Sequence, residues 1–145
     1  MLFQRGIIPI GLSRWYRSSP VPFSDQPRYV NAVAEISTGL PPDELLASLH
    51  AVEDALGRQR SQPNAARLID LDLIDYRGKI AAAAPGRATL PHPRLAGRAF
   101  VLKPLADLDP EWRHPDTGTQ VAELLSDLPR DQIIEPMDPQ PVLVF

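Results

Sequence analysis

The chain has 145 residues, 43% of them hydrophobic and 6% aromatic, which suits one domain with an aliphatic core. It has no cysteine and three histidines, which excludes a disulfide framework, a thiolate zinc site and a cysteine nucleophile, so any metal must be held mainly by carboxylates. The formal net charge of −3 at pH 7 and the lack of a long apolar run predict a cytoplasmic domain over residues 1–145 that binds neither nucleic acid nor a membrane.

The first elements along the chain are extended. Residues 12–17 have the composition of a strand, and they lead into a loop over residues 18–27 that is rich in proline and serine and long enough to be functional. A second strand is expected over residues 29–38, where small apolar side chains alternate with larger or polar ones. The face that we expect in the core carries Val30, Ala32, Ala34 and Ile36.

A helix and a third strand follow. Two prolines at positions 41 and 42 favour a helix start, because the first helical turn needs no backbone N–H from them, and Gly57 favours the end of that helix. Its apolar residues recur at helical spacing and are Leu45, Leu46, Leu49, Val52 and Leu56. Residues 68–76 then predict a strand that runs into a turn at Arg77 and Gly78.

The rest of the chain is punctuated by prolines. An apolar run over residues 99–102 is expected to stop before Pro104, and a last short helix is indicated by Val121, Leu124, Leu125 and Leu128. The proline-rich tail over residues 135–145 has no assigned function. Because crossovers are few and short, we favour an α+β sandwich with a mostly antiparallel sheet covered by helices over a doubly wound parallel fold.

An acid pair on the third predicted strand is the main chemical signal. Strand geometry places the carboxylates of Asp70 and Asp72 on one face, about 7 Å apart, with Ile69, Leu71 and Leu73 on the other face. Magnesium commonly takes one or two carboxylates together with substrate phosphates and water. The alternative is a solvated strand face without a metal.

Three arginines flank the acid pair. Arg58 and Arg60 follow the predicted helix, and Arg67 precedes the acidic strand. Arginines beside a carboxylate–magnesium site are what polyphosphate recognition requires. The alternative for Arg58 or Arg60 is a favourable interaction with the helix dipole.

Three further residues suggest binding. His92 lies between two prolines, which fixes its backbone and suits a phosphate contact, although a lone histidine in a loop is more often structural or exposed. Tyr29 and Asn31 share a strand face and have the chemistry to stack against and hydrogen-bond a flat heterocycle, but such pairs also cap sheet edges. The common glycine-rich phosphate loops are absent from the sequence. The residues by themselves therefore indicate a candidate magnesium-dependent phosphate enzyme.

Several segments, in order and spacing, resemble the 6-hydroxymethyl-7,8-dihydropterin pyrophosphokinase family. They are Tyr-Arg-Ser at residues 16–18, Asp-Gln-Pro-Arg-Tyr-Val-Asn at 25–31, Gly-Arg-Gln-Arg at 57–60, Arg-Leu-Ile-Asp-Leu-Asp-Leu at 67–73 and Leu-Pro-His-Pro-Arg-Leu-Ala-Gly-Arg-Ala-Phe-Val-Leu at 90–102. The R-x-x-D-x-D stretch is the family's signature, and the resemblance covers residues 13–118.

The resemblance implies a ferredoxin-like α+β fold and transfer of the β,γ-diphosphate of ATP to the pterin hydroxymethyl group in folate biosynthesis, with release of AMP. It implies that Asp70 and Asp72 hold two magnesium ions and act in catalysis with Arg58 and Arg67. The residues implied in ATP binding are His50, Glu53, Arg58, Arg60, Arg67, His92 and Arg98. Those implied in pterin binding are Ser18, Pro20, Val21, Tyr29, Asn31 and Phe100.

The chain also departs from the family pattern. Members begin with a strand, a Gly-Ser-Asn-type turn and a helix, whereas this chain starts near the end of that helix, so we expect a missing first strand and exposed apolar surface. Residues 61–66 lack the family's Trp-Gly-Pro. The rival hypotheses are a truncated, catalytically inactive remnant or a partner-binding subunit of the same family, and an unrelated magnesium-dependent phosphoesterase.

Overall fold

The computed structural model describes residues 1–18, 29–57 and 69–142. Contacts divide the chain into a first unit, Met1–Ile8 with Ser37–Pro93, and a second unit, Pro9–Ile36 with Arg94–Phe145. The described residues form helices and antiparallel strand pairs, so the predicted α+β class is confirmed. None of the helices in these residues has the length and apolarity that a membrane span requires.

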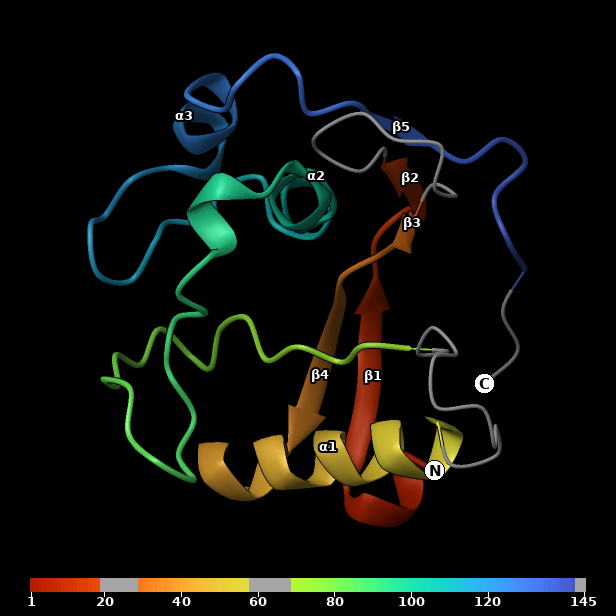
Figure 1. Cartoon of the computed structure of the whole chain (residues 1–145), viewed down its shortest axis with the longest axis vertical. Coiled ribbons are helices and arrows are strands. Elements are labelled where there is room, and N and C mark those ends of the chain that lie inside the picture. Colours follow the sequence, from red (N-terminus) through yellow and green to blue (C-terminus); the bar gives the residue numbers. More distant parts are fainter. Residues whose placement is uncertain (19–28, 58–68, 143–145) are drawn as a thin grey trace. The chain divides into compact units, whose positions relative to one another are not determined.

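Strands β1 (Ile7–Leu12) and β4 (Ala34–Thr38) form a two-stranded sheet and run in opposite directions (Figure 1). The predicted strand over residues 12–17 is wrong, because β1 ends at Leu12 and the next strand begins at Tyr16. The reason lies in the Ser13 hydroxyl, which accepts a hydrogen bond from the Val33 N–H at 2.9 Å and donates one to the Arg14 carbonyl at 2.8 Å. Such side-chain bonds to the backbone compete with a continuous strand ladder.

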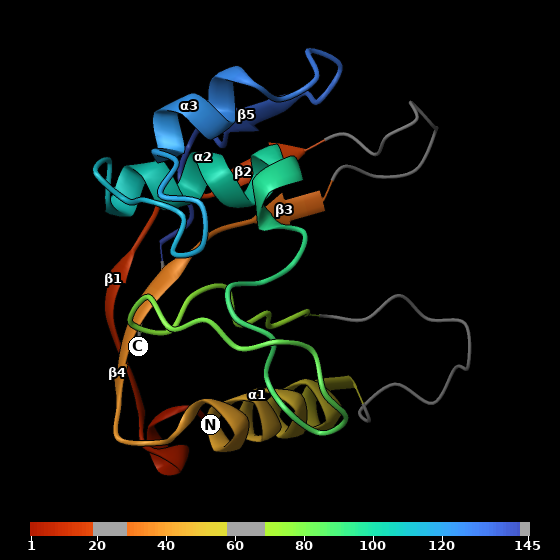
Figure 2. The same ribbon diagram turned by 90° about the vertical axis from the view of Figure 1, so that its left-hand side faces the viewer.

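The second unit contains a three-stranded sheet in the order β3-β2-β5. Strand β2 (Tyr16–Ser18) lies in the middle and pairs antiparallel with β3 (Tyr29–Asn31) and with β5 (Ile134–Pro136). Helix α2 (Ala99–Leu108) packs on β2 and β3, and α3 (Val121–Ser126) packs on α2 (Figure 2). The start of the tail that had no assigned role therefore forms an edge strand of this sheet.

The predicted strand over residues 29–38 is divided between the two sheets. Strand β3 pairs with β2, whereas β4 pairs with β1, so the chain changes sheets at residues 32–33. The prediction that one face is buried along the whole segment is therefore wrong: Val30 is 46% exposed and Ala34 is exposed, while Ala32 and Ile36 are half-buried. An alternating pattern marks one buried face only while the strand stays in one sheet.

Helix α2 does not stop before Pro104, as the sequence predicted, but runs through it to Leu108. A proline inside a helix removes one backbone hydrogen bond and costs about 3 kcal/mol. Pro104 is itself fully buried, and so is its neighbour Leu102. Burial of these and adjacent apolar side chains offsets the lost hydrogen bond. The predicted last helix is confirmed as α3.

The first unit is built on helix α1 (Pro42–Gly57), as predicted, with Leu45, Leu49 and Val52 buried. The predicted turn is also confirmed, because Arg77 and Gly78 both have positive φ, 51° and 70°, and the Lys79 N–H donates to the Tyr76 carbonyl at 2.9 Å. The short 3₁₀ helices are η1 (Phe3–Arg5) and η2 (Leu95–Gly97).

Strand β1 exposes apolar side chains on one face. Ile8, Ile10 and Leu12 alternate along the strand and are all exposed, Ile10 by 59%. The prediction of exposed apolar surface is thus confirmed on this strand.

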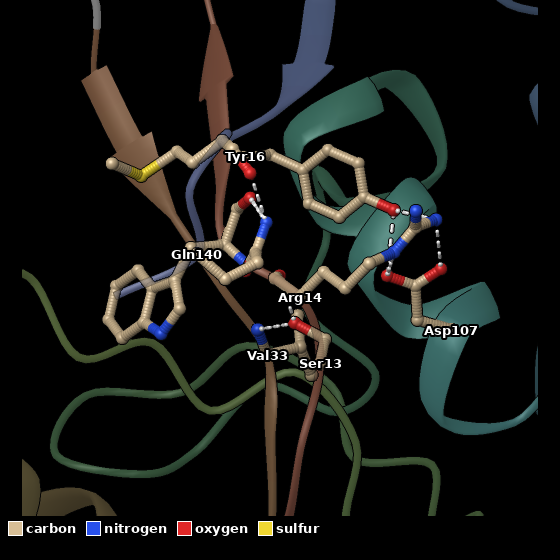
Figure 3. Close-up of polar contacts among 8 residues, drawn as sticks. Ser13, Arg14, Tyr16, Val33, Asp107 and Gln140 are labelled. Carbon is tan, nitrogen blue, oxygen red and sulfur yellow. Dashed lines mark hydrogen bonds and ion pairs between the residues drawn. The ribbon is translucent and has the colours of Figure 1, made fainter. Parts of the chain in front are cut away.

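A polar cluster joins β2 to the last turn of α2 (Figure 3). The Tyr16 hydroxyl donates to the Asp107 carboxylate at 2.7 Å, and Arg14 donates to both oxygens of that carboxylate at 3.1 Å. Burial raises the pKa of Tyr16, and the bond to Asp107 adds to this, so the phenol stays a donor. Burial opposes ionisation of Asp107, but the hydrogen bonds from Arg14 and Tyr16 prevail and hold its pKa below the usual value.

We expect Asp107→Ala to lower the free energy of unfolding by about 1–3 kcal/mol at pH 7, because the buried Tyr16 hydroxyl loses its acceptor. A carboxylate whose pKa is lowered by folding stabilises the protein above its unfolded pKa, and this contribution is lost as pH falls through the folded pKa. The difference in the free energy of unfolding between wild type and Asp107→Ala, measured with urea, should therefore decrease at acid pH. Asp54→Ala, on the exposed surface of α1, is the control, and equal stability of the two variants would contradict the role of Asp107.

Candidate active site

The segment with Asp70 and Asp72 belongs to the first unit. The predicted strand over residues 68–76 is wrong for its described part, because residues 69–75 form no strand. In the part of the chain that the structure describes, no strand pairs with this segment, and the Leu71 N–H donates to the Glu53 carboxylate at 3.0 Å. The alternation holds from Asp70 to Leu73, since Asp70 and Asp72 are exposed while Leu71 and Leu73 are half-buried. It fails at Ile69, which was expected on the face of the leucines and is 38% exposed.

Helix α1 and the Pro-His-Pro segment hold the acidic segment. Glu53 of α1 accepts the hydrogen bond from the residue that lies between the two aspartates. The His92 N–H donates to the Ile74 carbonyl at 2.8 Å, so the backbone of His92 is tied to the end of the same segment. The structure thus brings Glu53 and His92 to the acidic segment, whereas it places His50 on α1 with an exposed side chain.

The donor set suits a hard cation. Among the described residues, no group of three or more histidine, cysteine or acidic side chains is arranged to hold a metal ion. Asp70 and Asp72 are exposed and could supply one or two carboxylate ligands to such an ion. This fits Mg²⁺, which takes one or two carboxylates and completes its shell with phosphate oxygens and water, better than a metal that needs a full protein cage.

Ser18 and Asn31 lie side by side in the second unit. In the antiparallel pair of β2 and β3, Asn31 is opposite Tyr16, so its side chain shares a face with Tyr16 and Ser18. The Asn31 Nδ2 donates to the Ser18 Oγ at 3.3 Å. Ser18 is buried and Asn31 half-buried, and the two form a polar pair that lies diagonally across β2 and β3.

Arg98 and Phe100 lie at the start of α2 in the same unit. Arg98 is the residue before the helix, and its guanidinium carbon lies 5.2 Å from the centroid of the Phe100 ring, which is a cation–π contact. Helix α2 packs on β3, the strand that carries Asn31. The second unit therefore combines an amide, a hydroxyl, an aromatic ring and a cation.

The remaining predicted residues lie outside the described part of the chain and stay predictions. They are Pro20, Val21, Arg58, Arg60 and Arg67, together with residues 61–66 and the side chain of Tyr29.

The sequence did not reveal two contacts. Glu53 was expected near the nucleotide, and its hydrogen bond to the backbone of the acidic segment was not foreseen. Gln132, which had no role, contacts the backbone on both sides of Arg98. Neither contact can be recognised from a local sequence pattern, because the partners are 18 residues apart in the first case and more than 30 in the second.

Comparison with known proteins yields consistent matches. A family model described as 7,8-dihydro-6-hydroxymethylpterin-pyrophosphokinase matches residues 2–110. A 2-amino-4-hydroxy-6-hydroxymethyldihydropteridine pyrophosphokinase of Pseudomonas aeruginosa is 42% identical over 124 residues, 86% of this chain and 75% of that protein. The protein of the same name from Synechocystis sp. is 40% identical over 113 residues, 78% of this chain. Folic acid synthesis protein fol1 of Pneumocystis carinii is 38% identical over 141 residues, 97% of this chain. The chain spans 56% of the Synechocystis protein and 18% of the Pneumocystis protein.

Proposed function

This chain belongs to the 7,8-dihydro-6-hydroxymethylpterin-pyrophosphokinase family, and from that premise we propose that it transfers diphosphate from ATP to 6-hydroxymethyl-7,8-dihydropterin in folate biosynthesis. The observation that carries the proposal is the exposed pair of Asp70 and Asp72. The Leu71 N–H between them donates a hydrogen bond to the Glu53 carboxylate. The compartment that we propose is the cytoplasm, where ATP and magnesium are available.

We assign the ATP and metal roles as follows. Asp70 and Asp72 hold two magnesium ions, which when bound offset the negative charge of the phosphates. Glu53 keeps the two aspartates in place through the Leu71 N–H. The nucleotide and its phosphates are bound by side chains that the resemblance assigns to them, namely His50, Glu53, Arg58, Arg60, Arg67, His92 and Arg98.

We assign pterin binding to Ser18, Asn31 and Phe100 of the second unit. Asn31 offers both an amide donor and an acceptor to a heterocycle, and Ser18 fixes the orientation of that amide. Phe100 offers for stacking the ring face that Arg98 does not cover. Tyr29, Pro20 and Val21 complete the set that we propose.

The transfer needs no protein nucleophile. The pterin hydroxymethyl oxygen attacks the β-phosphorus of ATP, the bond between that phosphorus and the bridging α,β oxygen breaks, and AMP leaves with that oxygen. The hydroxyl proton passes to water. The residues of this chain orient the two substrates and stabilise charge, which is how phosphoryl transfer is generally accelerated.

Analysis of the products tests this proposal. The chain is incubated with ATP, Mg²⁺ and the pterin, and we expect AMP and a pterin diphosphate in equal amounts. ADP with a pterin monophosphate would contradict diphosphate transfer. Hydrolysis of a generic phosphodiester without ATP would favour a phosphoesterase instead.

A further inference from the structure

The first turn of α2 is closed by a side chain distant in sequence. Arg98 occupies the N-cap position but makes no side-chain capping bond. Instead, the Gln132 Oε1 accepts a hydrogen bond from the Ala99 N–H at 2.8 Å, and the Gln132 Nε2 donates to the Gly97 carbonyl at 2.8 Å. One amide therefore bridges the last residue of η2 and the first residue of α2 and satisfies an N–H that a helix start leaves without an intrahelical partner.

The two hydrogen bonds of Gln132 are made to the residues directly before and after Arg98. Its N–H donates to the Leu95 carbonyl at 3.2 Å, and its carbonyl accepts from Val101 and Leu102 at 3.1 and 3.0 Å. With Gly97 and Ala99 held by Gln132, the backbone is fixed on both sides of Arg98 as well as at Arg98 itself. This arrangement sets the direction in which the Arg98 side chain leaves the backbone, and the guanidinium lies over the Phe100 ring.

Gln132 is itself anchored to the sheet of the second unit. Two residues later, Ile134 begins β5 and is paired with Ser18 of β2. Strand β2 in turn pairs with β3, which carries Asn31. A short path through the backbone therefore connects the Ser18–Asn31 pair to Gln132 and then to the start of α2. The match to the family model ends at residue 110, before this glutamine.

We propose that Gln132 is a positioning residue that sets Arg98 and Phe100 relative to the strands carrying Ser18 and Asn31. The inference rests on the proposed function, in which Arg98 contacts phosphate and Phe100 the pterin. Gln132 touches neither substrate; it acts through the backbone of Gly97 and Ala99.

The test compares Gln132→Ala, Gln132→Glu and wild type. Alanine removes both bonds, whereas glutamate keeps an acceptor for the Ala99 N–H and loses the donor to Gly97. A matched control is Gln120→Ala, because Gln120 precedes α3 and makes no side-chain capping bond. We expect Gln132→Ala to raise the KM for pterin by about fivefold, because it loses both hydrogen bonds that hold the start of α2. The effect should be smaller for Gln132→Glu, which keeps one of them, and absent for Gln120→Ala.

Amide hydrogen exchange supplies a readout that does not depend on turnover. In Gln132→Ala we expect exchange to quicken at Ala99 and Phe100, while the amides of β3 and α3 keep their wild-type rates. Wild-type exchange at the start of α2, or equally faster exchange throughout the unit, would overturn the positioning role. If wild-type protein makes no pterin diphosphate, the proposed function fails, and the exchange pattern still decides whether Gln132 holds this helix end.

Discussion

Asp70→Asn and Asp72→Asn should each reduce turnover to less than about a tenth of the wild-type rate, because each removes a charged ligand for magnesium, whose charge stabilisation is worth several kcal/mol. Both aspartates are exposed, on a segment whose neighbouring leucines supply the packing. An amide of the same shape should therefore leave the free energy of unfolding nearly unchanged. Steady-state assays over a range of Mg²⁺ concentrations, together with urea unfolding, measure the two effects separately.

Asp54→Asn is the matched control for the acid pair. It removes one exposed carboxylate from α1 and should keep wild-type turnover. A variant at Asp70 or Asp72 that retained more than about a tenth of the wild-type rate would contradict the metal role.

Phe100→Ala should raise the KM for pterin by about 5- to 150-fold, because stacking of a flat heterocycle on an aromatic ring is worth about 1–3 kcal/mol. The KM for ATP should change much less. Phe100 is half-buried, so truncation also removes packing, and Phe100→Leu is needed as a second variant that fills much of the space without a ring. Fluorescence titration of the pterin measures the affinity directly.

Phe3→Ala controls for the loss of an aromatic side chain, since Phe3 is exposed in η1. If Phe100→Leu bound pterin as tightly as wild type, stacking on Phe100 would be refuted, and the residue would be part of the packing of α2 only.

The sequence predicted the elements whose signals are local. Helix α1 has two prolines at its start and leucines at helical spacing, and the turn at Arg77 and Gly78 uses a glycine with positive φ. The acid pair was also evident, because Asp70 and Asp72 alternate with leucines whether or not a strand forms. In each case the residues that decide the outcome lie within a few positions of one another.

The errors concern pairing between distant segments. Nothing local shows that β3 and β4 pair with different strands, or that the Leu71 N–H donates to the Glu53 carboxylate and the Ile74 carbonyl accepts from the His92 N–H. Pro104 stops a helix by local rules, yet burial keeps α2 continuous. Gln132 illustrates the same limit in the candidate site, because its partners are fixed only when the sheet and α2 are both formed.

The most direct test is magnesium-dependent release of AMP from ATP by this 145-residue chain, measured with and without 6-hydroxymethyl-7,8-dihydropterin. We predict AMP release that requires both Mg²⁺ and the pterin and is lost in Asp72→Asn. No AMP from a folded sample would contradict the proposed activity and favour a catalytically inactive family member. AMP release that is indifferent to the pterin would also contradict it, because it would show cleavage of ATP without transfer to the pterin.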